Sequence, residues 1–246
     1  NIGIDRRRSL PRYASQTFKA AARSTTHKRS QKLVSDKGIV AIFNDTFTNY
    51  HNPEIGNAAV KLLERLGYEV IIPSCSCCGR IDLSVGDDEK AKLKAKRNVE
   101  VALEALKTAD YIVGLEPSCI LSFKDEYLDL LPGNDDVVSV ADKTILIDEL
   151  LMQNIQAIKT LKLNKLPETI LVQTHCHQKA LLGENSSLLI LNSIPNCNVI
   201  ELNSGCCGMA GSFGFEKEHY ELSMGLGKMN LFDKINEYNQ DLEIVS

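Results

Sequence analysis

Two adjacent cysteine pairs are each followed by glycine, at Cys77-Cys78-Gly79 and Cys206-Cys207-Gly208. Thiolate sulfur is a soft ligand that suits zinc and iron–sulfur clusters. A disulfide between neighbouring cysteines would close a strained ring, and eight cysteines in 246 residues are too few for a disulfide scaffold. We therefore expect reduced thiols that bind a metal.

Each pair follows a short apolar run that predicts a buried strand, residues 68–72 before the first pair and residues 198–202 before the second. An irregular loop can turn both thiols of a pair inward if the glycine takes a positive φ, whereas a strand would point them to opposite faces. Cys119 and Cys176 also follow predicted strands. The predicted metal ligands are these six cysteines: Cys77, Cys78, Cys119, Cys176, Cys206 and Cys207.

The elements around these loops repeat in the two halves of the chain. Thr46 and Cys77 are 31 positions apart, and Cys176 and Cys206 are 30 apart, which predicts a duplicated βαβ unit. In open α/β sheets, ligands bind at the carboxyl ends of the parallel strands. We expect an α/β protein of two duplicated βαβ units with parallel strands and with the cysteine loops at the carboxyl edges of the strands. The predicted strands are 39–43, 68–72, 111–115, 170–173, 198–202 and 243–245, and the predicted helices are 53–66, 87–108, 141–163, 178–192 and a segment starting near 216.

The first 37 residues carry ten Lys or Arg and two Asp. A transit peptide, a tail that binds nucleic acid or a membrane surface, and a solvated linker all fit this composition, and we retain the linker. Because the chain starts with Asn1, we expect it to be part of a longer or processed polypeptide. The expected organisation is a basic linker over 1–37, a first unit over 38–135, a helical connector over 136–168 and a second unit over 169–246, truncated at its end.

Composition excludes several function classes. A net charge of −4 argues against a globally basic nucleic-acid binder, so we expect no nucleic-acid partner. The sequence lacks an apolar run near the ~18 residues of a membrane-spanning helix, and it has no G-x-G-x-x-G or P-loop motif. We expect a cytoplasmic protein with at most peripheral contact at the inner face of a membrane.

Four motifs resemble the cysteine-rich CCG domain family. The motifs are CCGR at 77–80, LEPSC at 115–119, HCHQKA at 175–180 and GCCGMAGSFG at 205–214. That family includes the cysteine-rich subunit of heterodisulfide reductase, the iron–sulfur subunits of glycolate oxidase and of anaerobic glycerol-3-phosphate dehydrogenase, and lactate-utilisation proteins. These motifs are most similar to the C-terminal region of FAD-linked D-lactate and D-2-hydroxyglutarate dehydrogenases. The resemblance covers residues 38–246.

This resemblance implies an iron–sulfur electron-transfer module of a flavin-dependent 2-hydroxy-acid dehydrogenase. It implies a 4Fe–4S type cluster on the six cysteines, with zinc as the alternative metal. FAD would lie on a dehydrogenase domain, in the same chain or a partner, together with a ferredoxin-like domain, and electrons would pass to a quinone or another carrier. No catalytic residue is identifiable, and this segment alone is not expected to contain the site that oxidises the substrate.

The chain departs from the full family pattern in two places. Thr46 stands where the family has a leading cysteine, and Glu116-Pro117-Ser118-Cys119 replaces a C-x-x-C motif. The first half is therefore short of soft ligands. In the second half, the downstream cysteine would be expected only after Ser246.

Other residues near the loops have alternative interpretations. His175 and His177 are a possible zinc pair with Cys176, but we favour hydrogen bonding around a cluster. Cys75 stays undecided, Cys197 is interpreted as a core residue, and Glu116 as a helix cap. A nucleophilic cysteine enzyme would not explain two Cys-Cys pairs. A structural or regulatory zinc-binding module without redox activity is the alternative function.

Overall fold

The computed structural model describes residues 3–22, 36–163, 167–183, 186–238 and 242–245. The chain divides into two compact units. The N-terminal unit comprises residues 11–154, and the C-terminal unit comprises residues 155–246 together with residues 1–10. Among the described residues, no helix combines the length and the apolar character needed to cross a membrane.

The N-terminal unit contains a four-stranded sheet in the order β2-β1-β3-β4, and all neighbouring strands are parallel. Its strands are β1 (Ile39–Ile42), β2 (Glu69–Ile71), β3 (Tyr111–Gly114) and β4 (Thr144–Leu146). Val40, Ala41 and Ile42 are fully buried, so successive side chains on both faces of β1 are covered. Continuous burial of this kind is typical of a parallel sheet between helical layers.

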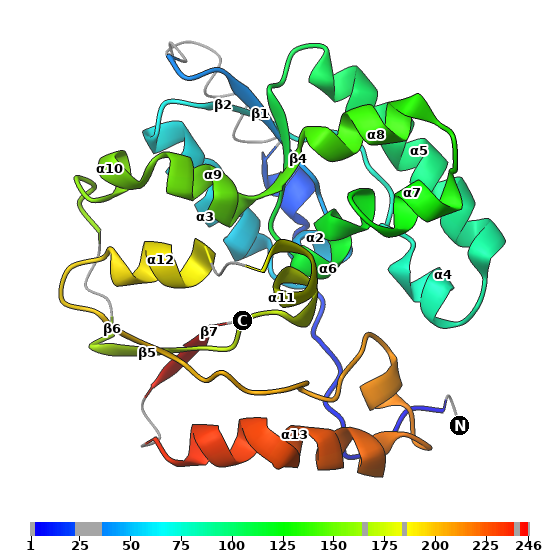
Figure 1. Cartoon of the computed structure of the whole chain (residues 1–246), viewed down its shortest axis with the longest axis vertical. Helices are drawn as coiled ribbons and strands as arrows, with labels where there is room; N and C mark the ends of the chain where they lie inside the picture. Colours follow the sequence, from blue (N-terminus) through cyan, green and yellow to red (C-terminus); the bar gives the residue numbers. More distant parts are fainter. Residues whose placement is uncertain (1–2, 23–35, 164–166, 184–185, 239–241, 246) are drawn as a thin grey trace. The chain divides into compact units, whose positions relative to one another are not determined.

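Helices lie on both sides of this sheet, with α3 and α9 on one side and α5 and α8 on the other (Figure 1). Helix α3 connects β1 to β2, whereas α5 connects β2 to β3 in the opposite direction across the sheet. Right-handed crossovers then place the two helices on opposite faces, and the point of reversal lies between β1 and β3. The helices of this unit are α2 (Thr46–Tyr50), α3 (Pro53–Arg65), α4 (Arg80–Ser84), α5 (Asp88–Leu106), α6 (Pro117–Ile120), η1 (Leu121–Phe123), α7 (Glu126–Leu130), α8 (Asp135–Asp142) and α9 (Ile147–Gln153).

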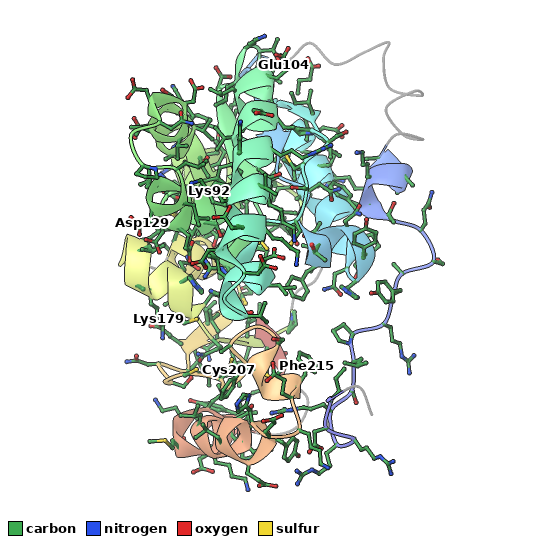
Figure 2. All side chains as sticks on the ribbon, turned by 90° about the vertical axis from the view of Figure 1, so that its right-hand side faces the viewer. Lys92, Glu104, Asp129, Lys179, Cys207 and Phe215 are labelled. Atoms are coloured by element: carbon green, nitrogen blue, oxygen red, sulfur yellow. The ribbon has the colours of Figure 1, made fainter. Side chains whose placement is uncertain are left out.

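Helix α5 confirms the helix predicted over 87–108, and its sequence explains its orientation. Small residues at helical spacing, including Ala91 and Ala95, are fully buried, while Lys92 and Glu104 are exposed (Figure 2). Asp87 caps the helix by accepting a hydrogen bond from the backbone N–H of Lys90. The alanine face lets the helix pack closely against the loop that carries the first cysteine pair.

The C-terminal unit contains a three-stranded parallel sheet in the order β6-β5-β7. Its elements are α10 (Ile155–Ile158), β5 (Thr169–Val172), α11 (Cys176–Leu182), α12 (Ser186–Asn192), β6 (Asn198–Glu201), η2 (Phe213–Phe215), α13 (Tyr220–Asn236) and β7 (Glu243–Val245). Leu171, Leu202 and Leu231 form a buried cluster between the sheet and α13. The predicted strand over 243–245 is confirmed. The α/β class with parallel, duplicated βαβ units is confirmed as well.

Two predictions about the connecting segments are wrong. The expected helical connector over 136–168 contains β4, which pairs with β3 through Ile145 and Val113. This strand was missed because its apolar run is only three residues long and lies between two helices. The single helix expected over 178–192 is instead α11 and α12, and α11 begins at Cys176.

The prediction of a solvated N-terminal linker is wrong for two residues, whose side chains are buried. Phe18, in a helical stretch over 18–22, is fully buried, and its ring covers Gly56 so closely that an added Cβ would lie 2.7 Å from it. Asp5 is also buried, and its backbone N–H donates to the Phe215 carbonyl at 2.9 Å within the C-terminal unit. Residues 23–35 of the predicted linker lie outside the described part of the chain.

Candidate metal centre

The strand registers make the cysteine loops of the two units equivalent. Ile39 pairs with Glu69, and Thr169 pairs with Asn198 in the same way. Cys77 lies eight residues after Glu69, and Cys206 lies eight residues after Asn198. Each cysteine pair therefore follows the corresponding strand of its unit, β2 or β6, at the same distance in the sequence. As predicted, these loops lie at the carboxyl ends of the strands.

The register also locates the counterpart of Cys119. Tyr111 of β3 pairs with Val40, and Glu243 of β7 pairs with Ile170 of β5. Cys119 lies eight residues after Tyr111. The position eight residues after Glu243 falls after Ser246, so a fourth cysteine there stays a prediction.

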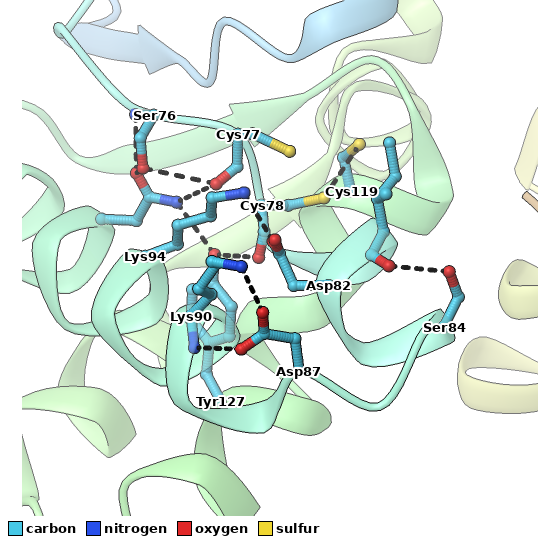
Figure 3. Close-up of polar contacts among 12 residues, drawn as sticks. Ser76, Cys77, Cys78, Asp82, Ser84, Asp87, Lys90, Lys94, Cys119 and Tyr127 are labelled. Atoms are coloured by element: carbon cyan, nitrogen blue, oxygen red, sulfur yellow. Dashed lines mark hydrogen bonds and ion pairs between the residues drawn. The ribbon is translucent and has the colours of Figure 1, made fainter. Parts of the chain in front are cut away.

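In the N-terminal unit, the structure brings the predicted cysteine ligands together from two loops. The Sγ atoms of Cys78 and Cys119 are 3.3 Å apart, and both residues are buried (Figure 3). Cys77 is partly exposed and contacts the Cys78 thiol as well as the Thr46 hydroxyl. Two sulfurs on one tetrahedral zinc, with bonds of about 2.3 Å, would be separated by about 3.8 Å. The thiols therefore fit a thiophilic metal with little rearrangement.

Asn98 of α5 fixes the backbone of this loop. Its side chain is fully buried, and its Oδ1 accepts from the backbone N–H of Ser76 at 2.8 Å and from the Ser76 hydroxyl at 3.0 Å. Its Nδ2 donates to the Cys77 carbonyl at 3.1 Å and to the Tyr127 hydroxyl at 2.9 Å. Tyr127 in turn donates to the Cys78 carbonyl at 2.9 Å. This network satisfies the polar groups of a partly buried loop and orients both thiols.

Arg80 joins the two cysteine loops of this unit. Its Nε donates to the Ser118 carbonyl at 2.7 Å, and its Nη2 donates to the Ser122 hydroxyl at 3.3 Å. Nη2 also lies 2.6 Å from Oε1 of Glu126. A planar guanidinium can serve three partners in fixed directions, which a lysine ammonium cannot. Arg80 therefore keeps the loop with Cys119 next to the Cys-Cys-Gly loop.

We expect Arg80→Lys to weaken metal binding more than it weakens folding. Groups that orient metal ligands typically change metal affinity by about 10–100-fold when they are replaced. The unfolding free energy should fall by only about 1–2 kcal/mol, because the charge remains. Competition with a chelator for Co²⁺ measures the first effect and urea unfolding the second. Arg97→Lys, at an exposed position of α5, is the control, and equal affinity in both variants would contradict the role of Arg80.

The surroundings of the first pair set the protonation state of its two thiols. The hydrogen bond to Cys119, together with burial, raises the pKa of the Cys78 thiol to about 12, and contact with Cys78 raises the pKa of Cys77. The ammonium of Lys94, paired with Asp82 at 2.5 Å, lies close to both thiols of the pair (Figure 3). The thiols are therefore protonated without metal, and a metal would bind by displacing these protons.

In the C-terminal unit, the structure groups His175, Cys176 and His177. One ligand atom from each of the three residues lies within 4.8 Å of the others, and the Cys176 Sγ is 3.7 Å from the His177 Nδ1. The imidazole of His175 accepts a hydrogen bond from the backbone N–H of His177 at 3.2 Å, as the N-cap of α11. Thiolate and imidazole are both good zinc ligands. The two histidines are therefore placed more like zinc ligands than we expected from the sequence, which favoured hydrogen bonding around a cluster.

Cys206 and Cys207 are exposed and are not part of the group formed by Cys176 and its neighbours. Figure 2 shows Cys207 on the loop of the C-terminal unit that leads toward η2. The backbone N–H of Gly208 donates to the Cys206 Sγ at 3.3 Å. Backbone donors of this kind stabilise a negatively charged sulfur.

Gly208 has a φ of +83°, and a Cβ added there would lie 2.2 Å from the carbonyl oxygen of Ser223. We therefore expect Gly208→Ala to lower the unfolding free energy of the C-terminal unit by about 2–4 kcal/mol, through strain and overlap together. Gly211→Ala is the matched control, because Gly211 has a φ of +65° but no atom within 4 Å of the added Cβ. It should lose only about 1 kcal/mol. Equal losses in urea unfolding would contradict the close packing on Ser223.

Two arginines near the N-terminus contact the residues that follow the second cysteine pair. Arg8 donates through Nε to the Gly214 carbonyl at 2.7 Å and through Nη2 to the Ser223 hydroxyl at 2.6 Å. The Arg7 guanidinium lies 3.5 Å from the centre of the Tyr220 ring, a cation–π contact at the start of α13. The arginines of the basic segment therefore support the second cysteine loop.

The remaining candidates have simpler roles. Burial raises the pKa of the Cys75 thiol to about 12, and no contact with the other thiols is found for it in the described residues. Cys197 is half-buried just before β6. Glu116 accepts hydrogen bonds from the backbone N–H and the hydroxyl of Ser118, which confirms it as the cap of α6.

The sequence interpretation missed Arg80, Asn98, Tyr127 and Arg8. Asn98 gave a weak signal, because asparagine is unfavourable in the middle of a helix whose neighbouring face is alanine. Arg80 gives no signal in the sequence beyond its place in the CCGR motif. Nothing in the sequence connects Tyr127 or Arg8 to loops 49 and 206 residues away.

Comparison with known proteins identifies the family. The sequence profile of the cysteine-rich CCG domain matches residues 40–124 and 170–245, one match in each unit. The chain belongs to the CCG cysteine-rich domain family. The two CCG regions contain all six predicted cysteine ligands.

Several curated proteins are similar to this chain. One subunit of the anaerobic glycerol-3-phosphate dehydrogenase of Escherichia coli K12 is 33% identical over 99% of this chain, which spans 60% of that relative. Lactate utilization protein A of Macrococcus caseolyticus is 29% identical, covering 71% of each chain. D-2-hydroxyglutarate dehydrogenase of Pantoea ananatis is 26% identical over 76% of this chain and 18% of its own length. No solved structure matches the chain significantly.

Proposed function

We propose that this chain is the iron–sulfur electron-transfer part of a flavin-dependent dehydrogenase of 2-hydroxy acids of the lactate, glycolate or 2-hydroxyglutarate type. The observation that carries the proposal is the pair of buried sulfurs of Cys78 and Cys119, 3.3 Å apart. They come from two loops at the carboxyl edge of a parallel sheet, where α/β proteins bind cofactors. Both relatives named for dehydrogenases support an oxidoreductase, and the one named for 2-hydroxyglutarate supports a 2-hydroxy acid as the substrate.

The proposed ligands are the six cysteines at these loops: Cys77, Cys78 and Cys119 in the N-terminal unit, and Cys176, Cys206 and Cys207 in the C-terminal unit. A bound 4Fe–4S type cluster accepts and donates single electrons. The chain itself supplies the soft sulfur donors and excludes water from two of them by burial. The Asn98 side chain and the Tyr127 hydroxyl hold the loop carbonyls, so that the thiols are oriented before the metal arrives.

The partners follow from the same proposal. FAD on a dehydrogenase domain, in this polypeptide or another, would take the hydride from the substrate, and a ferredoxin-like domain would accompany it. Electrons would then leave this module for a quinone or another carrier. The chain spans 60% of the E. coli relative and 18% of the P. ananatis relative. We therefore propose that it works with these partners in a larger assembly.

A reductive titration tests the redox proposal. The anaerobically purified protein should lose visible absorption on addition of dithionite, develop an EPR signal, and recover its absorption with a soluble quinone. A protein that keeps a colourless, EPR-silent state through the titration would contradict electron transfer. Cys197→Ala is the control, because we do not assign Cys197 to the cofactor.

A zinc-binding module without redox activity is the second candidate. The observation that favours it is the group of His175, Cys176 and His177, whose ligand atoms lie within 4.8 Å of one another. Mixed thiolate and imidazole donors are typical of zinc. His177→Ala should lower the zinc affinity if this candidate is correct and should leave the iron content unchanged if the cysteines alone hold a cluster.

A further inference from the structure

The two cysteine sites differ at one position that the strand register makes equivalent. Thr46 lies seven residues after Ile39, and Cys176 lies seven residues after Thr169. Both are the first residue of a helix, α2 in one unit and α11 in the other. Where the C-terminal unit offers a thiol, the N-terminal unit therefore offers a hydroxyl.

The Thr46 hydroxyl lies at the metal site rather than away from it. It hydrogen-bonds the Cys77 thiol, so the side chain faces the first cysteine pair. The start of α2 is fixed, because the buried Asp45 accepts from the backbone N–H of Thr48 at 2.9 Å and from its hydroxyl at 2.6 Å. The helix therefore holds Thr46 where Cys176 stands in the other unit.

A neutral threonine hydroxyl is not among the side chains that proteins use to bind zinc, which are thiolate, imidazole and carboxylate. Sites with three protein ligands keep an open position for water or substrate, whereas sites with four are closed. Lys94 adds a positive charge close to Cys77 and Cys78, although its ion pair with Asp82 offsets part of it. Asp45 and Glu116 oppose this charge, so the vacant position follows from the number of ligands and not from the charges.

We propose that the metal centre of the N-terminal unit keeps one coordination position open beside Thr46, for a small exogenous ligand such as water or azide. This inference rests on the proposed metal centre of that unit, formed by Cys77, Cys78 and Cys119. The Thr46 hydroxyl donates a hydrogen bond to the exogenous ligand instead of binding the metal. The equivalent position of the C-terminal unit is closed by Cys176.

Co²⁺ is a suitable probe, because its visible spectrum reports the number of thiolates and the coordination number without any iron–sulfur chemistry. The full chain is loaded with Co²⁺ under anaerobic conditions and titrated with azide, and all proteins compared, including the one with the wild-type Thr46, carry Cys207→Ala so that the N-terminal centre alone contributes. The wild type should show a shift of the cobalt d–d bands. In Thr46→Cys, the thiolate charge-transfer absorbance of this centre should rise by about a third, since a fourth thiolate joins three. Its apparent dissociation constant for azide should rise at least about tenfold, because the position is closed.

Thr46→Val is the matched control, because it removes the hydroxyl without adding a ligand. It should still respond to azide, but more weakly than the wild type. A wild-type spectrum that ignores azide, or an equal response in Thr46→Cys, would overturn the open position while leaving the metal centre intact. If Cys78→Ala leaves the cobalt spectrum unchanged, the unit has no such centre, and both the ligand assignment and this inference fail.

Discussion

Cys78→Ala is expected to remove the metal centre of the N-terminal unit. Cys78 is the most central of its thiols, since it contacts both Cys77 and Cys119, and its replacement leaves two sulfurs from separate loops. With one centre in each unit, the iron or zinc bound per chain should fall by roughly half. Metal analysis of anaerobically purified protein measures the loss, and EPR or cobalt spectra show which centre remains.

Cys197→Ala provides the comparison for this experiment. Cys197 lies before β6, half-buried and outside the cysteine loops, so its replacement should leave the metal content unchanged. Cys119→Ala should reproduce the effect of Cys78→Ala, because the two sulfurs are neighbours. Full metal content in Cys78→Ala would exclude this thiol as a ligand, whatever the metal is.

Asn98→Ala is expected to destabilise the N-terminal unit by about 3–5 kcal/mol, a loss close to the largest seen for single substitutions. The change leaves the backbone N–H of Ser76 and one hydrogen bond of Tyr127 without a partner inside the protein, and it leaves the Cys77 carbonyl with only the hydrogen bond from the Ser76 hydroxyl at 3.3 Å. A buried polar group that loses its partner costs about 1–3 kcal/mol. Urea unfolding of the metal-free protein measures the effect without any contribution from metal binding.

Lys96→Ala on the exposed side of α5 is the control for Asn98→Ala, and it should change the unfolding free energy by less than about 0.5 kcal/mol. In metal-loaded protein, Asn98→Ala should also lower metal affinity, because the cysteine loop is no longer fixed. If Asn98→Ala were as stable as Lys96→Ala, the hydrogen bonds around the loop would not be what holds it.

The strands and the cysteine loops could be predicted because their signals are local. The run at Ile39–Ile42 is apolar and ends at polar residues, and each Cys-Cys-Gly motif directly follows such a run. The equivalence of the two units followed from spacing alone, to within one residue. Strand β4 could not be found in the same way, because three apolar residues between helices look like part of a helix.

The residues that position the thiols could not be predicted, because they act across long stretches of sequence. Asn98 lies 22 residues from Ser76, and the Cys78 and Cys119 thiols are 41 residues apart. Only the parallel order β2-β1-β3 brings these segments to one edge. The burial of Phe18 was equally hidden, since the basic residues around it indicated a solvated segment, whereas Gly56 leaves space for its ring.

Iron, acid-labile sulfide and zinc counts on the anaerobically purified full chain, combined with EPR, test the central claim most directly. We expect iron and sulfide in comparable amounts, an EPR signal on reduction or oxidation, and a loss of roughly half of the iron and sulfide when Cys78 or Cys207 is replaced by alanine. Stoichiometric zinc with no iron would contradict the redox function and would establish the chain as a zinc-binding module.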